Sequence, residues 1–174
     1  IDPKTKNKTS WGRLIIKPRI KTLFASSFSF VPSKSNQTKI GLNQLKIDGF
    51  DYNDLFLNKT LTGNVLSIQG LDLTLFENDK KANKVNLTQF DFNKIDIAEL
   101  NVKRYDGDSV NLLLSRLTIN ADEPKMETQS DSTRVFSYKN IKLSMDKSLV
   151  LAKSKKQIVT TQNINFNSDD STLE

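Results

Sequence analysis

The sequence has no cysteine and no histidine among its 174 residues. Without cysteine the chain forms no disulfide and has no thiolate nucleophile, and cysteine usage gives no indication of the compartment. Without histidine, most nucleophilic triads, imidazole-based zinc sites and imidazole general bases are excluded. The six glycines are scattered singly, so no glycine-rich phosphate loop is present. The composition therefore predicts a protein that is not an enzyme and that has no cofactor and no metal site.

Pairs of acidic residues are the remaining candidates for chemistry. They are Asp106 with Asp108, Asp122 with Glu123, and Asp169 with Asp170. Each pair lies in a predicted turn, where carboxylates commonly accept hydrogen bonds from the local backbone. We therefore assign no catalytic or metal-binding role to any of these pairs.

Long apolar runs are also absent. No stretch approaches the roughly 18 consecutive apolar residues that a membrane-spanning helix requires, and no signal-peptide core is recognisable. The sequence starts with Ile1 rather than methionine and ends where a new alternating pattern begins. We therefore expect the chain to be part of a longer protein.

Apolar and polar residues alternate along most of the chain. In the clearest stretch, apolar residues stand at Leu66 and Ile68, the alternation slips by one residue at Gly70, and it resumes at Leu71 and Leu73. A period of two is typical of a strand with one buried face, and a slip turns the second half to the other face unless the backbone absorbs the extra residue. A β-bulge does this and also bends the strand. The stretch therefore predicts one bulged strand.

The same slip recurs through the sequence at intervals of 21 to 24 residues. Its copies are Ser27/Phe28, Gly49/Phe50, Gly70/Leu71, Lys94/Ile95, Arg116/Leu117, Asn140/Ile141 and Asn163/Ile164. Self-similarity at such a period indicates a repetitive or solenoid-like architecture. We predict a disordered basic lead-in over residues 1–10, followed by a single β-repeat domain over residues 11–174.

The predicted fold class is all-β. Long helical patterns are absent, so a sheet with one apolar face must pack on a second sheet, curl toward a barrel, or hold an apolar guest. Bulges at corresponding points of successive strands favour curling, which predicts a repetitive antiparallel meander that forms a groove or half-barrel. In the alternative, the slips only mark strand ends, and the chain forms a β-sandwich with an ordinary core.

Positive charge is concentrated near the N-terminus. Residues 1–46 contain ten lysines and arginines and one acid, whereas the rest of the chain contains 16 basic and 19 acidic residues. A basic segment of this kind suits a phosphate-bearing surface such as anionic lipid headgroups, although it is more often a solvated lysine-rich chain end with no partner. The aromatic residues between positions 11 and 30 alternate as core residues do, so we expect no nucleic-acid partner.

The slipped phrase resembles a known protein family. Residues 66–75 and their copies at 45–52, 136–145 and 164–173 resemble the AsmA-like family of the envelope of Gram-negative bacteria, over roughly residues 38–174. The resemblance lies in the repeat texture. It implies a curled β-sheet with an apolar concave face, held in the periplasm or cell envelope by a membrane anchor outside this sequence. It also implies a part in phospholipid transport and envelope homeostasis, and no catalytic residues.

Together, pattern and resemblance predict an apolar groove that shelters the acyl chains of a phospholipid or another acyl lipid, next to a membrane surface. The predicted groove residues are Leu66, Ile68, Leu71, Leu73, Phe90, Phe92, Leu112, Leu114, Tyr138 and Ile141, and the predicted headgroup contacts are Arg13, Lys17, Arg19 and Lys21. The alternative is an extracytoplasmic structural or adhesive β-domain that binds protein or glycan. Strand edges at the ends of the repeat array also predict edge-to-edge self-association.

Overall fold

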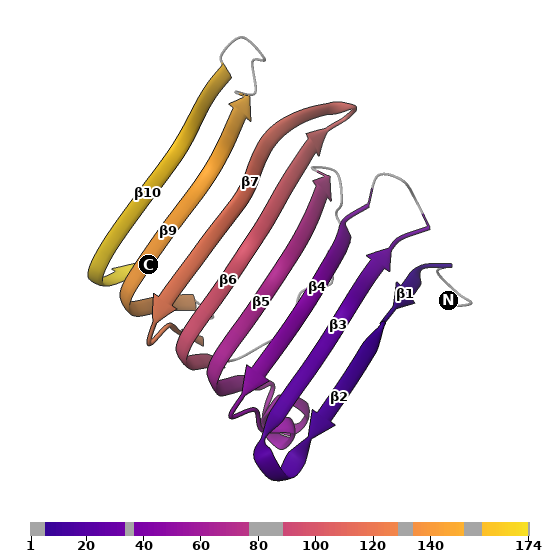
Figure 1. Cartoon of the computed structure of the whole chain (residues 1–174), viewed down its shortest axis with the longest axis vertical. Coiled ribbons are helices and arrows are strands. Elements are labelled where there is room, and N and C mark those ends of the chain that lie inside the picture. The colour runs from indigo at the N-terminus through magenta and orange to yellow at the C-terminus, as the bar shows by residue number, and fades with distance from the viewer. Residues whose placement is uncertain (1–5, 34–36, 77–88, 129–133, 152–157, 174) are drawn as a thin grey trace.

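Strands account for most of the structure. The computed structural model describes residues 6–33, 37–76, 89–128, 134–151 and 158–173, and these residues form one sheet with two short helical turns (Figure 1). The elements are β1 (Lys8–Ser10), β2 (Arg13–Lys17), the 3-10 turn η1 (Pro18–Ile20), β3 (Thr22–Val31), β4 (Lys39–Asp48), the π-helical turn η2 (Asp54–Asn58), β5 (Thr60–Phe76), β6 (Gln89–Asp106), β7 (Ser109–Asp122), β8 (Lys125–Thr128), β9 (Arg134–Leu151) and β10 (Ile158–Leu173).

The strands follow the order of the sequence across the sheet, β1-β3-β4-β5-β6-β7-β9-β10. β1 and β2 both pair with β3, so together they occupy one strand position in the sheet. β7 and β8 both pair with β6 and β9, so they also share one strand position. The predicted turn between β6 and β7 is a hairpin in which Gly107 adopts a positive φ of 59°. The N-terminal and C-terminal strands therefore lie at opposite edges of the sheet (Figure 1).

One pairing departs from the predicted antiparallel meander. β5 and β6 are parallel, with Thr60 opposite Gln89 and Phe76 opposite Tyr105, whereas the other pairings are antiparallel. Alternation specifies which face of a strand is buried but not the direction in which the strand runs, so the sequence pattern held no signal for this reversal. Residues 77–88, which connect the two strands, lie outside the described residues.

Four of the seven predicted slips lie on a line that crosses the sheet. Ser27, Gly70, Arg116 and Asn163 each adopt a positive φ, between 50° and 64°, at the first residue of a slip. The strand registers place these residues in one continuous row, which we call the first kink line: Gly12, Ser27, Asn43, Gly70, Glu99, Arg116, Asp146 and Asn163. A left-handed residue absorbs the extra position, so apolar side chains on both sides of the line share one face.

The register explains why most slips do not act as ordinary bulges. Neighbouring strands each have their extra residue in the same row of the sheet. The register of residue pairs is therefore the same on both sides of that row, as between Ser26↔Gln44 and Phe28↔Leu42. Register shifts of the predicted bulge kind occur between β6 and β7, where Glu99 and Arg116 lie on opposite sides of the Leu100↔Leu117 pair. There the Arg116 backbone N–H donates to Asn101 Oδ1 at 3.0 Å, so a side chain replaces the missing ladder partner.

A second kink line lies six or seven residues further along each strand. It runs through Gly49, Asn64, Asn93, Glu123 and Lys139, with positive φ at Gly49 and Glu123. The predicted slip at Gly49 lies on this line and those at Lys94 and Asn140 lie one residue from it, and the 21 to 24 residue period arises because successive slips alternate between the two lines. At this line β7 ends and the ends of β5, β6, β9 and β10 bend sharply (Figure 1).

The core lies inside the bend at the second kink line. Ile47, Phe50, Leu66, Phe92, Ile95 and Ala121 form one buried cluster, and Leu55 of η2 packs against it. A Cβ placed on Gly63 would lie 2.7 Å from the Phe92 ring, so this glycine allows the ring to lie directly over β5. Phe92 is 1% exposed. The sheet thus closes one end by folding onto itself.

These observations settle the choice between groove and sandwich. The described strands belong to one curled sheet, which is the predicted all-β groove or half-barrel, and the alternative of two packed sheets is wrong. The predicted lead-in is also shorter than expected, because Lys8–Ser10 form β1 and pair with β3 through Ser10↔Ser29. Residues 1–5 lie outside the described residues.

Candidate apolar groove, basic edge and polar pocket

The two kink lines divide the apolar face into three bands. The upper band lies beyond the first line, the middle band lies between the lines, and the lower band lies beyond the second line. All ten predicted groove residues belong to these bands. Leu71, Leu73, Leu112 and Leu114 are in the upper band, Leu66, Ile68 and Ile141 are in the middle band, and Phe90, Phe92 and Tyr138 are in the lower band.

The lower and middle bands mainly form the core. Leu66 and Phe92 are buried, and Ile68, Phe90 and Ile141 pack against the same cluster. Phe90 and Phe92 also contact each other, with ring centroids 4.8 Å apart. A ligand would have to displace this packing in order to reach them, so these residues hold the groove closed at one end.

The upper band has a different environment. Leu71, Leu73, Leu112 and Leu114 are only partly buried, although they stand in the middle of the sheet. Leu73 lies opposite Ile40 on β4 and Val102 on β6. The upper band is therefore an apolar surface that the described residues cover incompletely.

The sequence analysis missed part of this surface. Leu42 lies opposite Leu71, and Val102 lies opposite both Leu73 and Leu114, so these residues extend the upper band without a gap. Leu100 and Val102 are each 8% exposed. Their alternation carries the same signal as that of the predicted residues, but it follows Glu99, where the analysis placed no slip.

The four predicted headgroup contacts lie together at the β2 edge. Arg13 and Lys17 are on β2, Arg19 is on η1, and Lys21 directly follows η1. Lys21 Nζ lies 3.7 Å from Asp51 Oδ2, so this ammonium group already has a carboxylate partner. Ile20 is 64% exposed and, with Lys17, Pro18 and Arg19, lines an open pocket of about 520 Å³. Basic and apolar groups thus occur side by side at this edge.

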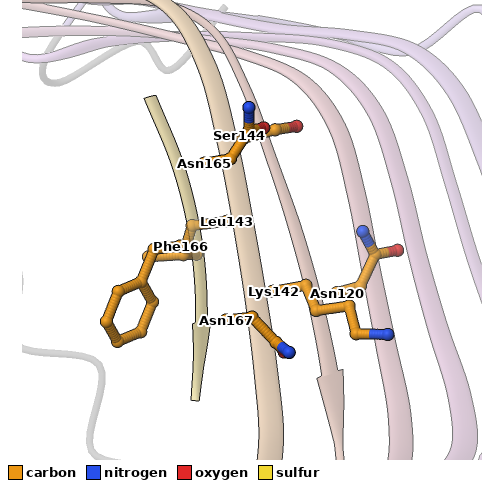
Figure 2. Close-up of a pocket in the computed structure, with 7 residues that line it drawn as sticks. All are labelled: Asn120, Lys142, Leu143, Ser144, Asn165, Phe166 and Asn167. Atoms are coloured by element: carbon orange, nitrogen blue, oxygen red, sulfur yellow. The ribbon is translucent and has the colours of Figure 1, made fainter. Parts of the chain in front are cut away.

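The opposite, polar face of the sheet has a pocket of its own near β10. It has a volume of about 320 Å³ and is lined by Asn120, Lys142, Leu143, Ser144, Asn165, Phe166 and Asn167. The register places Asn120, Lys142 and Asn167 in one row across β7, β9 and β10. Figure 2 shows the Phe166 ring pointing away from the amide groups of Asn165 and Asn167. The pocket therefore offers amide and ammonium groups, which suit hydroxyl or carbonyl ligands.

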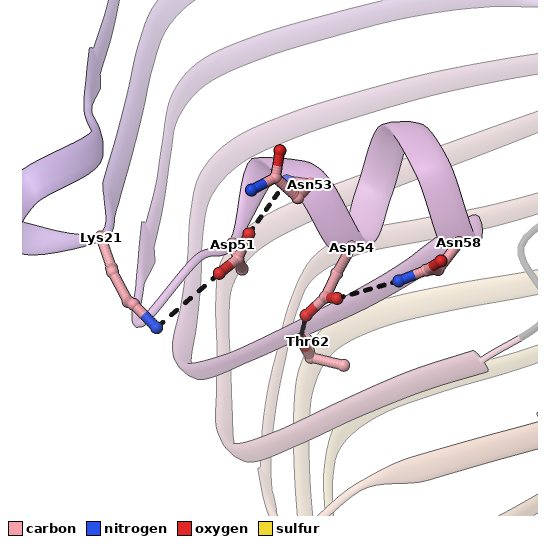
Figure 3. A network of polar contacts seen from close by, with 6 residues as sticks. All are labelled: Lys21, Asp51, Asn53, Asp54, Asn58 and Thr62. Carbon is pink, nitrogen blue, oxygen red and sulfur yellow. Dashed lines mark hydrogen bonds and ion pairs between the residues drawn. The ribbon is translucent and has the colours of Figure 1, made fainter.

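η2 fixes the loop that closes the core. Asp54 accepts hydrogen bonds from Asn58 Nδ2 at 3.2 Å and Thr62 Oγ1 at 3.4 Å, and Asp51 accepts one from the Asn53 N–H at 2.9 Å (Figure 3). The network joins the turn to β5 through Thr62 and to the basic edge through Asp51 and Lys21. The network holds Leu55 against the core, and we therefore assign it a structural role.

Two of the three acidic pairs lie at turns beside the sheet, and that none of the pairs is catalytic stays a prediction. Asp106 ends β6 and Asp108 lies in the hairpin turn, whereas Glu123 pairs with Lys139 at 3.5 Å. Among the described residues, no group of three or more acidic side chains is arranged to hold a metal ion. That the protein is not an enzyme stays a prediction.

No family model, curated protein or solved structure matches the chain. The resemblance to the AsmA-like family therefore stays a resemblance of repeat texture. Within the described ranges, no helix combines the length and apolarity needed to cross a membrane.

Proposed function

We propose that this chain is a non-enzymatic module of the cell envelope, where it binds or transfers acyl lipids and contributes to envelope homeostasis. The observation that carries the proposal is the upper band, in which large aliphatic side chains in the middle of a sheet remain only partly buried. Exposed contiguous apolar surface of this kind commonly marks a binding site. A curled sheet also gives such a surface the elongated shape of a hydrocarbon chain.

The energetics of the upper band suit an acyl chain. Transfer of apolar surface from water gains about 25 cal/mol per Å², or about 0.8 kcal/mol for each buried CH₂ group. Burial of six to eight CH₂ groups against Leu71, Leu73, Leu112 and Leu114 would therefore gain about 5 to 6 kcal/mol. This attraction is non-directional, so we expect selectivity for chain length and little selectivity for the headgroup.

Lipid analysis of the purified protein tests the proposal. We expect native mass spectrometry, followed by organic extraction, to show copurified phospholipid in near-stoichiometric amounts. Leu73→Asp combined with Leu114→Asp places two charges in the upper band and should abolish lipid retention. Gln69→Asp with Gln162→Asp is the matched control, because both glutamines are exposed and lie outside the three apolar bands.

The outcomes separate lipid binding from loss of structure. Circular dichroism and thermal unfolding should show that both double variants remain folded. A clean protein mass, together with no uptake of fluorescent phospholipid from vesicles by the unmodified protein, would rule out lipid carriage by this chain. Equal retention by the groove variant and its control would place the lipid elsewhere.

A second candidate function rests on the polar pocket of Figure 2. If the apolar face serves only as a core, Asn120, Lys142 and Asn167 are the side chains placed to hold a glycan or a peptide backbone, as an extracytoplasmic adhesive domain requires. Binding to a glycan array that is lost in Asn167→Ala, with no lipid uptake, would favour this function over the first.

A further inference from the structure

Apolar side chains are exposed at the two edges of the sheet, whereas those of the same face are buried in its centre. At one edge Leu14 of β2 is 51% exposed, and at the other edge Phe166 of β10 is 49% exposed, whereas Leu66 in the centre is 7% exposed. All three residues lie in the middle band of the apolar face. Among the described residues, no strand pairs with the outer side of β2 or of β10. Such edges commonly pair with another strand.

The two edges also differ in charge. β10 contains Asp169 and Asp170 and no basic residue. The other edge contains Lys8, Arg13, Lys17 and Arg19 in β1, β2 and η1, and it has no acidic residue. Two β10 edges would repel each other, and so would two β2 edges. A β10 edge and a β2 edge are complementary.

We propose that β10 of one copy of this chain pairs with β2 of a second copy, which extends the sheet in a head-to-tail direction. β2 and β10 run in the same direction across the sheet, so simple translation of one copy places them in parallel, as β5 and β6 already are. The contact is heterologous and leaves one edge of each kind open, so it allows further copies to add. The proposal does not rest on lipid binding.

The side-chain pattern selects the register. Leu14 and Phe166 must face the same side, which leaves only registers that differ by two residues. We choose the one that places Leu14 beside Phe166 and Asp169 beside Lys17. In this register Asn163 also lies beside Trp11, next to Gly12, so the first kink line continues from one copy into the next with a step of one residue, which is smaller than the offset between Glu99 and Arg116.

Charge reversal tests the pairing of unlike edges. Sedimentation equilibrium of the lipid-free protein at low salt should show a mass that rises with concentration. Asp169→Lys with Asp170→Lys should weaken the association about tenfold or more, and so should Lys17→Glu with Arg19→Glu. An equimolar mixture of the two variants should associate again, because each then offers the other an edge of opposite charge.

Two results would overturn the proposal. One is an unmodified protein that remains monomeric up to its solubility limit. The other is association that the β2 variant does not weaken, which would indicate pairing between two β10 edges. Lys94→Glu with Lys103→Glu is the matched control, because these exposed lysines lie on β6 in the centre of the sheet and should leave the association unchanged.

Introduced cysteines test the register, since the chain has no cysteine of its own. In the proposed register Asn165 lies beside Arg13, so a mixture of Asn165→Cys and Arg13→Cys should form a disulfide-linked dimer. Lys17→Cys stands four residues away, about 13 Å along a strand, and should not link to Asn165→Cys because a disulfide requires Cα atoms closer than about 7 Å. Preferential linkage of the second pair would overturn the register.

Discussion

Gly70 shows how one residue sustains the first kink line. Its φ of 64° is favourable for glycine, and a Cβ at this position would lie 2.1 Å from Asn43 Nδ2 and 2.9 Å from Asn43 Cβ. The whole Asn43 side chain, rather than its tip, would then have to move. The kink at this point therefore requires both a left-handed backbone and an empty space beside it.

We predict that Gly70→Ala lowers the free energy of unfolding by about 3 kcal/mol, of which 1–2 kcal/mol arises from the left-handed backbone and the rest from the overlap with Asn43. Gly107→Ala is the matched control. Its φ is 59° but no atom lies within 4 Å of the added Cβ, so it should cost only the backbone part. Urea unfolding measures both. Equal losses would show that Asn43 accommodates the methyl group.

Phe92 and Phe166 lie on the same apolar face but in different environments. Phe92 is 1% exposed and belongs to the buried cluster, whereas Phe166 is 49% exposed at the sheet edge. We expect Phe92→Ala to destabilise the chain by about 3–5 kcal/mol because it leaves a cavity, and Phe166→Ala to cost about 1 kcal/mol or less. Thermal unfolding of dilute protein compares them, and similar losses would contradict the assignment of Phe92 to the core.

The residues that bend the chain were partly predictable from the sequence. Alternation breaks at five residues of positive φ, because the breaks follow directly from which side chains face the core: Ser27, Gly49, Gly70, Arg116 and Asn163. Glu99 escaped notice because the slip at Lys94 precedes it by five residues and was taken as the one slip of that strand. A single slip per strand was too simple a pattern for strands that bend twice.

At the scale of the elements, η2 is attached to the sheet by side-chain hydrogen bonds rather than by backbone strand pairing. Asp54 accepts hydrogen bonds from Asn58 and Thr62, and the Asp54 carbonyl accepts one from Thr60 Oγ1 at 3.3 Å. The neighbouring Leu55 packs on the core. Both the carboxylate and the carbonyl group of Asp54 therefore attach the turn to β5.

We predict that Asp54→Ala destabilises the chain by about 1 kcal/mol, since it removes two hydrogen bonds from a partly buried carboxylate. Asp54→Asn keeps one acceptor oxygen and should lose less than half as much. Chemical unfolding gives the stability, and hydrogen exchange of the amides of η2 shows whether the loss is local. Faster exchange confined to β10 would contradict the proposed attachment.

The sequence predicted strand positions better than strand relationships. Alternation located β5 and the hairpin after β6, because both depend on local side-chain pattern and turn chemistry. It did not predict that β5 and β6 are parallel. Strand direction depends on contacts between distant residues, which a local pattern does not encode.

At the scale of the whole molecule, the recurrence of bends in the sequence favoured a groove over a sandwich, and the single curled sheet confirms this preference. Which apolar residues remain accessible did not follow, since the same alternation describes the buried Phe92 and the partly exposed Leu73. Accessibility is decided by how far the lower band folds over the middle band at the second kink line. That depends on close approaches such as the one at Gly63, which the sequence pattern does not reveal.

Positive charge is concentrated at the β2 edge of the sheet. Arg13, Lys17 and Arg19 stand at one edge of the sheet, and each basic residue near an anionic membrane surface contributes about 1 kcal/mol to binding. We predict that Arg13→Gln, Lys17→Gln and Arg19→Gln together weaken binding to phosphatidylglycerol vesicles about a hundredfold. Lys21 should contribute less, because Asp51 already neutralises it.

Vesicle co-sedimentation at low protein concentration, where copies do not pair, measures this binding. The matched control is Lys103→Gln with Lys142→Gln and Lys147→Gln, which removes the same charge from exposed positions on β6 and β9. If the whole surface attracts the vesicle, both triple variants should bind it equally less tightly. If the β2 edge faces the membrane, only the first triple variant should bind less tightly. Raised salt should abolish the difference, because screening acts on exposed charges, and binding that withstands salt would indicate that the apolar face, rather than the basic edge, contacts the membrane.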